Sequence, residues 1–184
     1  MKFKLILTVL AAFALAGQTL AGQSGKGRKV LVAYFSWSGN TRELAGQIAE
    51  AAGADIYEIV PAKAYPSDYN TCVAQAKREK QEAARPALKG KLPATKNYDV
   101  VFVGFPNWWG TMPMPVATFL DKIDLKGKTV IPFVTHGGGG RQQCIADFRK
   151  AAAEADVIEG PVMEGTAVKG AKAKVEAWVR EKLR

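Results

Sequence analysis

Short runs of β-branched and aromatic residues alternate along the chain with stretches whose apolar residues recur every three or four positions. The short runs predict strands at 29–36, 55–60, 99–105, 129–135 and 162–168. The longer patterns predict helices at 41–52, at 67–84, at 115–123, around Ile145 and Phe148, and from Val175 to Leu183. Strands alternating with helices predict an α/β fold, a three-layer doubly wound domain with a five-stranded parallel sheet. We expect one such domain over residues 29–184, with a basic surface loop at 85–98.

The first 21 residues have the pattern of an export signal. Lys2 and Lys4 precede an uncharged apolar run from Leu5 to Leu15, and small residues at Thr19 and Ala21 suit cleavage after Ala21. Cleavage after Ala16 is the weaker alternative, and a retained membrane anchor or a buried helix stays open. We therefore expect a signal peptide at 1–21, a flexible mature N-terminus at 22–28, and export to the periplasm.

Composition narrows the classes of protein. The chain has 184 residues, enough for one ordinary domain, and its two cysteines and single histidine exclude a disulfide scaffold and a Cys- or His-rich metal site. The net charge is +9, but the basic residues are scattered rather than gathered in one stripe with aromatics. This pattern argues against nucleic acid and favours contact with acidic surfaces. We expect a monomer or a weak dimer.

Three unusual loops follow the first, third and fourth predicted strands, whose carboxyl ends meet at one edge of a doubly wound sheet. The first loop, Ser36 to Thr41, offers hydroxyl groups and a glycine at a helix N-terminus, where a phosphate binds well. A plain helix cap is the alternative.

The other two loops add aromatic rings and bare backbone. Residues 106–111 contain adjacent tryptophans, Trp108 and Trp109, of which at least one should be exposed or face a ligand, although one core and one surface ring is an alternative. Residues 135–140 contain four consecutive glycines, which suit close approach of a ligand or, alternatively, a flexible turn.

The motifs S-W-S-G-N-T, P-N-W-W-G and T-H-G-G-G-G, in this order and spacing, resemble those of the flavodoxin-like FMN-binding family, in its short-chain form. The resemblance covers residues 29–184 and implies strand order 2-1-3-4-5 and FMN as cofactor. It implies that the first loop binds the phosphate, Trp108 or Trp109 packs on the isoalloxazine, Gly110 lies near the flavin N5, and Thr135 to Gly138 line the pyrimidine side. The implied cofactor-binding residues are Ser36, Ser38, Gly39, Asn40, Thr41, Pro106, Asn107, Trp108, Trp109, Gly110, Thr135, His136, Gly137 and Gly138.

The sequence departs from the family pattern twice. The third loop lacks the aromatic residue that many flavodoxins place there, which leaves one ring face open to a substrate, and the chain is basic where flavodoxins are commonly acidic. The leading hypothesis is an exported FMN-binding electron-transfer protein, with a redox partner protein or a small-molecule acceptor. The alternatives are an FMN-dependent reductase of quinones or similar acceptors, and a flavin-binding module without turnover.

Six further residues have roles for which the sequence offers alternatives. Tyr65, Asp68 and Tyr69 reach the ring from the side, or Asp68 simply opens a helix. His136 is a proton donor near the flavin or an ordinary hydrogen-bonding residue. Export makes a disulfide between the two cysteines, Cys72 and Cys144, the default expectation. The predicted topology instead puts the helix at 115–123 between them, so we predict two free thiols.

Overall fold

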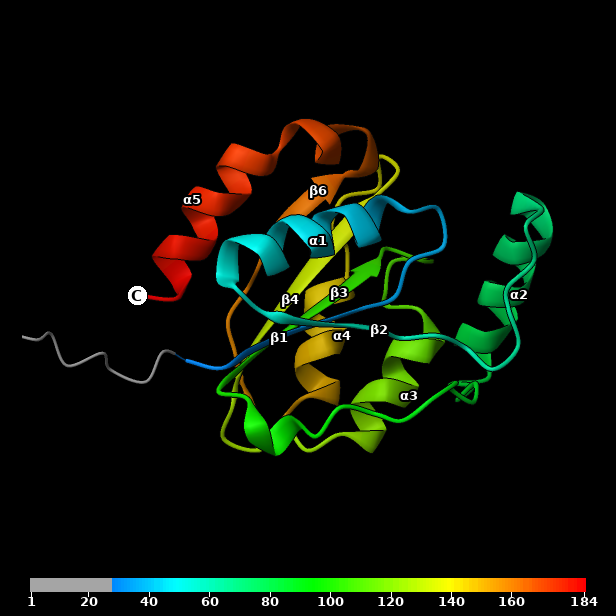
Figure 1. Ribbon diagram of the computed structural model, residues 1–184. Helices are drawn as coiled ribbons and strands as arrows, with labels where there is room; N and C mark the ends of the chain where they lie inside the picture. Colours follow the sequence, from blue (N-terminus) through cyan, green and yellow to red (C-terminus); the bar gives the residue numbers. More distant parts are fainter. Residues whose placement is uncertain (1–27) are drawn as a thin grey trace, which may run out of the picture.

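The computed structural model describes residues 28–184, which form one α/β domain (Figure 1). The predicted signal peptide at 1–21, and the predicted flexible segment except Arg28, lie outside the described residues. The elements are, in chain order, β1 (Val30–Tyr34), α1 (Asn40–Ala52), β2 (Asp55–Glu58), α2 (Tyr69–Gln81), η1 (Thr95–Asn97), β3 (Val100–Pro106), α3 (Met114–Lys122), β4 (Thr129–His136), α4 (Cys144–Ala151), β5 (Asp156–Val157), β6 (Val162–Glu164), η2 (Gly165–Gly170) and α5 (Lys172–Lys182).

The strands form a parallel sheet in the order β2-β1-β3-β4-β5, and β6 also pairs with β4. This confirms the predicted fold class and strand order. Helices α1 and α5 pack against one face of the sheet, while α3 and α4 cover the other (Figure 1). The central strands β1 and β3 contribute side chains to both hydrophobic clusters, as their continuous apolar runs require.

The fifth strand is the one element that the sequence places incorrectly. The prediction was a single strand at 162–168, but the structure has β5, then β6, then a 3₁₀ helix from Gly165. Pro132 in β4 explains the interruption, because proline has no N–H with which to pair the neighbouring strand. Gly160 N still donates to Pro132 O at 3.0 Å, and the register then shifts by one residue before Val134 pairs with Val162.

The remaining boundaries differ from the predictions by a few residues. Helix α2 begins at Tyr69 because Asp68 caps it, accepting hydrogen bonds from the Thr71 amide at 2.9 Å and the Thr71 hydroxyl at 2.6 Å. Helix α3 begins at Met114 with Pro115 in its first turn. Within 28–184, no helix is long and apolar enough to cross a membrane.

Both cysteines are free and buried. Cys72 lies in α2 and Cys144 begins α4, and α3 contacts both of these helices. This is the arrangement from which the two free thiols were predicted.

Candidate functional site

A pocket of about 690 Å³ opens at the carboxyl edge of the sheet, where the three unusual loops meet α2. Of the residues predicted to bind the cofactor, all line it except Ser36, Gly39, Thr41 and Gly138. The lining residues that were not in that set are Trp37, Tyr69, Cys72, Val73, Ala76, Gly139, Gln142, Glu164, Gly165 and Thr166.

The first loop leads into an open helix N-terminus. Gly39 is the N-cap of α1 with φ 95°, a left-handed conformation that favours glycine, and no side chain caps the helix. Ser36 Oγ instead accepts a hydrogen bond from Gly39 N at 3.2 Å, which closes the loop. The plain-cap interpretation is therefore wrong, and the first-turn amides of α1 remain available to an anion beside Ser38 and Asn40.

Thr41 was expected to bind the cofactor, but it does not line the pocket. Its side chain is buried, and its Oγ1 lies 2.8 Å from Thr135 Oγ1, so the two hydroxyls join the first loop to the end of β4. Arg42, the nearest cation in sequence, forms an ion pair with Glu58 on β2. Anion binding at this loop would thus depend on the helix dipole, backbone amides and hydroxyls.

The second loop is a tight turn with an unusual backbone. Trp108 and Thr111 exchange two backbone hydrogen bonds of 3.0 and 3.1 Å, and the residues between them, Trp109 and Gly110, have φ 54° and 82°. A positive φ at tryptophan is uncommon and indicates local strain held by the surroundings.

Asn107 connects the second loop to the third. Its side-chain Oδ1 accepts from Gly110 N at 2.9 Å, and its Nδ2 donates to Gly140 O at 2.7 Å. Its backbone N–H donates to Thr135 O at 2.7 Å. One side chain therefore fixes the position of the Gly110 peptide relative to the glycine loop.

The two tryptophans occupy different environments. Trp108 packs edge-on against Phe35 and Tyr65, with ring centroids 5.3 and 4.9 Å away, at the border of the hydrophobic core. Trp109 is 44% exposed. The prediction that at least one ring is exposed or faces a ligand is confirmed, because both rings line the pocket and Trp109 is open to solvent.

Helix α2 holds Trp109 in place. The indole Nε1 donates to Val73 O at 3.0 Å, and Lys80 Nζ donates to the Trp109 carbonyl at 2.6 Å. Lys77 Nζ lies 5.2 Å from the centroid of the indole ring, within cation–π range. Trp109 and α2 together form one wall of the pocket, and the wall carries two positive charges.

The α2 side of the pocket was largely missed because the spacing of its apolar residues was used only to predict a helix. Tyr69, Val73 and Ala76 recur at helical intervals, yet all three line the pocket. Tyr69 is exposed, and its ring centroid lies 6.2 Å from that of Trp37. Of the three residues left open, Tyr69 lies at the pocket and Asp68 is a helix cap, as the alternative interpretation had it.

Tyr65 packs against Trp108 and Cys72 lines the pocket from α2, and both are in their neutral forms. Burial raises the pKa of the Tyr65 phenol, and its hydrogen bond to Glu79 raises it further. Burial also raises the pKa of the Cys72 thiol, with a smaller contribution from the charge of Glu79. Neither group is therefore an ionised nucleophile at neutral pH.

The third loop exposes His136 and the glycines. His136 ends β4 and lines the pocket, and its Nδ1 accepts a hydrogen bond from Gly138 N at 3.1 Å. A neutral imidazole in this arrangement carries its proton on Nε2, which leaves one donor free. Gly138 acts through this contact and does not itself line the pocket.

The segment after β6 completes the pocket beside the first loop. A Cβ on Gly165 would lie 2.2 Å from Asn40 Nδ2, so a larger residue there would require the Asn40 side chain to move away from its place at the pocket. Glu164 and Thr166 flank it at the pocket wall. The sequence assigned these residues to a strand, so no signal marked them as pocket residues.

The pocket has the features that a phosphorylated flat aromatic ligand requires. Its volume falls within the usual range for small-molecule sites, roughly 300–1,000 Å³. The uncapped α1 N-terminus supplies donors for a phosphate, and the tryptophans and glycines supply an aromatic and an open wall for a ring. The donor set therefore fits FMN. Among the described residues, no group of three or more His, Cys, Asp or Glu side chains is arranged for a metal ion.

Comparisons with known proteins agree with this architecture. A candidate flavoprotein from Bacteroides uniformis has a crystal structure with TM-score 0.75 and 34% identity, covering 84% of this chain and 99% of its own. A flavoprotein from Lactobacillus acidophilus, solved in complex with FMN, has TM-score 0.65 and 25% identity, covering 78% and 98%.

Curated relatives match over a smaller part of their length. An NAD(P)H dehydrogenase (quinone) from Acidovorax ebreus is 31% identical over 124 residues, which is 60% of this chain and 59% of the relative. The chain spans 59% of the length of this relative, and 46% of the length of an NAD(P)H dehydrogenase (quinone) from Cupriavidus metallidurans. The family model for flavodoxin matches residues 29–182. The chain belongs to the flavodoxin family.

Proposed function

We propose that the chain is an FMN-binding electron-transfer protein that works outside the cytoplasm. The observation that carries this proposal is the pocket itself, in which an uncapped helix N-terminus, two tryptophans and a glycine loop from three separate segments converge. The flavodoxin family and the FMN complex of the Lactobacillus acidophilus flavoprotein support FMN as the ligand.

The first loop would hold the phosphate. Ser38 and Asn40 line the pocket next to the free amides of α1, and the helix dipole favours a dianion there. Ser36 and Gly39 shape the loop, and Thr41 fixes it to β4 through Thr135.

The second and third loops would hold the ring. Trp108 and Trp109 offer aromatic surface, and Asn107 keeps the Gly110 peptide at a fixed distance from the glycines of the third loop. FMN supplies one- and two-electron transfer when it is bound, and the protein supplies binding, orientation and electrostatic tuning. Lys77 and Lys80 at the Trp109 wall would favour added negative charge on the ligand.

A second candidate is an FMN-dependent reductase of quinones or similar acceptors. The names of the curated relatives favour it. The third loop also favours it, because the loop carries no Phe, Tyr or Trp to cover a bound ring and His136 keeps a donor on Nε2. The absence of nicotinamide cofactors outside the cytoplasm argues against it if the predicted signal peptide directs export. Steady-state oxidation of NAD(P)H in the presence of a quinone separates the two, and zero turnover excludes the reductase.

Export to the periplasm is the remaining part of the proposal, and it rests on the charge and hydropathy of residues 1–21. Mass spectrometry of protein recovered from the periplasm tests it, with a mature N-terminus at Gly22 expected. A mature protein that retains Met1 would contradict cleavage.

The test of the cofactor site uses a charge placed in the first loop. Ser38→Asp should lower FMN affinity at least tenfold because a carboxylate repels the phosphate dianion, while riboflavin, which has no phosphate, should lose much less. Ser38→Asn is the matched control, similar in size and uncharged. Fluorescence titration of both flavins measures the effect, and equal losses for FMN and riboflavin would show that the phosphate binds elsewhere.

A further inference from the structure

The segment 85–98, which we call the basic strap, has a distinctive charge pattern. It contains Arg85, Lys89, Lys91 and Lys96 and no aspartate or glutamate. The sequence predicted an irregular surface loop here, and the structure shows that this loop is anchored along its whole length.

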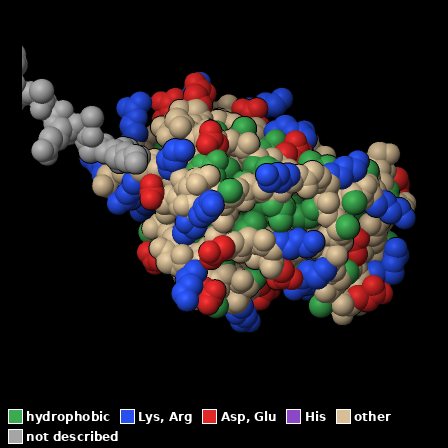
Figure 2. All heavy atoms as spheres, turned by 60° about the horizontal axis from the view of Figure 1, so that its bottom comes forward, with side chains coloured by type: hydrophobic (Ala, Val, Ile, Leu, Met, Phe, Trp, Pro, Cys, Tyr) green, Lys and Arg blue, Asp and Glu red, His purple; other side chains and the backbone are tan. Residues whose placement is uncertain are grey.

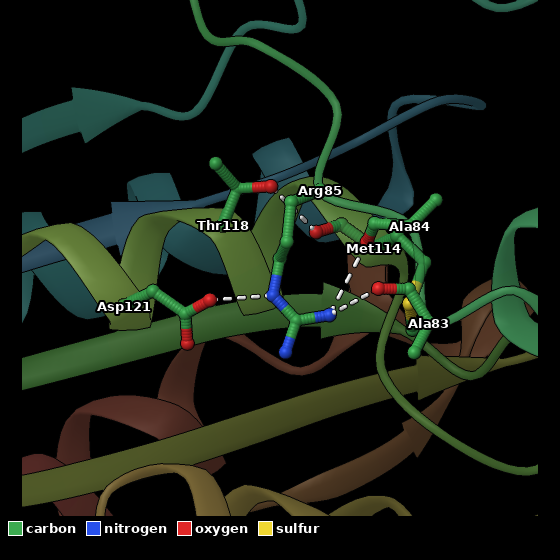
Figure 3. A network of polar contacts seen from close by, with 6 residues as sticks. All are labelled: Ala83, Ala84, Arg85, Met114, Thr118 and Asp121. Atoms are coloured by element: carbon green, nitrogen blue, oxygen red, sulfur yellow. Dashed lines mark hydrogen bonds and ion pairs between the residues drawn. The ribbon is translucent and has the colours of Figure 1, made fainter.

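The start of the strap is fixed to α3. Arg85 Nε donates to Asp121 on α3, and Arg85 Nη1 donates to the carbonyls of Ala83 and Ala84 at 2.9 and 3.2 Å (Figure 3). Ala83 has φ 47°, so this fork of hydrogen bonds also stabilises a left-handed residue just after α2.

The middle of the strap extends the sheet edge. Ala62 N donates to Ala87 O and Lys89 N donates to Val60 O, both at 2.7 Å. At its far end, the Tyr98 hydroxyl donates to Asp55 Oδ2 at 2.8 Å. The strap therefore runs beside the outer edge of β2 and the residues that follow it.

The lysines of the strap face outward. Leu88 and Leu92 pack against the core, while Lys89, Lys91 and Lys96 are exposed. The connection between α3 and β4 lies alongside, because Lys128 Nζ donates to Tyr98 O at 2.8 Å. The end of α3 and this connection add two exposed lysines, Lys122 and Lys126, together with two exposed aspartates, Asp121 and Asp124. Within the part of the chain that the structure describes, none of these five lysines takes part in an ion pair.

An exposed aliphatic side chain lies beside these charges. Val60, whose carbonyl accepts from Lys89 N, is 36% exposed, whereas Ile56 pairs in register with Val32 and so lies on the α1 face of the sheet. Figure 2, which brings the bottom of Figure 1 forward, shows an apolar area on this side of the molecule with Lys and Arg side chains, and also Asp and Glu side chains, around it. The face thus combines a net positive charge with apolar groups that water solvates poorly.

This face is separate from the pocket. The far end of the strap and the α3–β4 connection lead into the amino ends of β3 and β4, whereas the pocket is built at the carboxyl edge of the same strands. The middle of the strap pairs with Val60 and Ala62, just past the carboxyl end of β2, but no residue of the strap lines the pocket. The described chain also begins at the amino end, where Lys29 N donates to Asp99 Oδ2 at 2.8 Å, next to Tyr98 of the strap. The apolar run Leu5 to Leu15 thus precedes the fold by only residues 16–27.

We propose that the face formed by the basic strap, Lys122, Lys126 and Val60 docks on an anionic lipid bilayer. A bilayer presents negative charge over a broad plane, which matches lysines spread along a strap, and its headgroup boundary accepts aliphatic side chains. If the predicted signal peptide directs export, residues 1–27 would connect the membrane to the end of the domain where Lys29 lies. No residue of this face lines the pocket, so docking here would leave the pocket accessible to a partner or acceptor.

The test measures binding of the FMN-loaded chain from Gly22 onward to sedimentable vesicles. We expect binding to vesicles containing about one third phosphatidylglycerol, little binding to pure phosphatidylcholine, and release by 0.5 M NaCl. The triple variant Lys89→Gln, Lys91→Gln, Lys96→Gln should lower the partition coefficient at least tenfold.

The matched control removes the same charge elsewhere. Arg149→Gln, Lys169→Gln, Lys174→Gln changes three exposed cations on α4, η2 and α5, and its partitioning should stay within about threefold of the parent. Equal losses in the two triple variants would overturn the proposal, because net charge alone would then govern binding. The proposal would also be overturned if the protein does not bind anionic vesicles. This holds even if the same face binds an acidic protein instead.

The outcome is independent of the cofactor proposal. FMN affinity of both triple variants should equal that of the parent, and vesicle binding should persist without FMN, because no residue of this face lines the pocket.

Discussion

Helices α1 and α2 have the same length but contribute in different ways to the molecule. Five residues of α1 are buried against the sheet and α5, whereas α2 buries only Cys72 and Ala76 and stands at the side of the domain (Figure 1). Helix α1 therefore belongs to the core, and its N-terminus is a rigid part of the pocket. Helix α2 is a wall held by a few polar contacts, from Val73 and Lys80 to Trp109 and from Glu79 to Tyr65. Local stability should differ accordingly between the two sides of the pocket.

The largest expected difference is in global stability. Leu44→Ala on α1 removes a fully buried side chain and should lower the free energy of unfolding by about 3 kcal/mol. Val73→Ala on α2, a half-buried pocket position, should cost less than about 1 kcal/mol. Urea denaturation measures both, and similar losses would contradict the division between core helix and wall.

A smaller effect is expected on flavin affinity when the Trp109 ring is removed from the pocket wall. Trp109→Ala should weaken FMN binding by about 1 kcal/mol, or roughly fivefold, and leave the stability of the apoprotein nearly unchanged, because the ring is exposed. Trp109→Phe keeps an aromatic ring and should retain most of the affinity. Unchanged affinity in Trp109→Ala would transfer the stacking role to Trp108.

Thiol reactivity reports on the opening of the wall. Cys72 lines the pocket from α2, so iodoacetamide should modify it slowly in the apoprotein and more slowly with FMN bound. Burial raises the pKa of Cys144 to about 12, and this thiol should stay unmodified in the folded protein. Denatured, unreduced protein should titrate with two free thiols. A rate for Cys72 that FMN does not change would place it outside the ligand site.

The smallest effect concerns the cap of α2. Its hydrogen bonds from the Thr71 hydroxyl and amide lower the pKa of Asp68 below its ordinary value of 3.8. A lowered pKa means that the cap stabilises the helix above pH 3.8 and is lost as the pH falls through the lower, folded value. Protection of the first-turn amides of α2 against exchange, taken relative to the intrinsic rate at each pH, should therefore fall below pH 3.8 in the parent. Asp68→Asn should remove that pH dependence, and a parent-like profile in the variant would assign it to another group.

Local patterns predicted the apolar strands and ten of the twenty residues that line the pocket, and the family resemblance added the sheet order. Apolar runs identified β1, β3 and β4, and the residues directly after their carboxyl ends then had to meet. The α2 wall was less accessible, since Tyr69, Val73 and Ala76 have the spacing of a core helix, and only the tertiary position of α2 shows that they face a cavity. Similarly, the hydroxyl contact between Thr41 and Thr135 joins residues that are distant in the sequence.

Pro132 was a sequence signal for the break between β5 and β6, but it stood inside an apolar run that was interpreted as an uninterrupted strand. Pro132 stands in a run of strand-forming residues, and its missing N–H matters only for the neighbour on one side. Hydropathy shows that β4 is buried but not which of its residues donate toward β5, so the interruption required the register of the sheet.

The same proline has a consequence for how copies of the molecule behave at high concentration. A long, straight outer strand offers a row of unpaired donors and acceptors on which another chain can add. Here the outer strand next to β4 is cut into two short pieces opposite Pro132, while backbone bonds from Ala87 and Lys89 cover the continuation of β2 at Val60 and Ala62. Both borders of the sheet are thereby poor templates for intermolecular β pairing, and the domain is guarded against aggregation at the two places where an open sheet is most exposed to it.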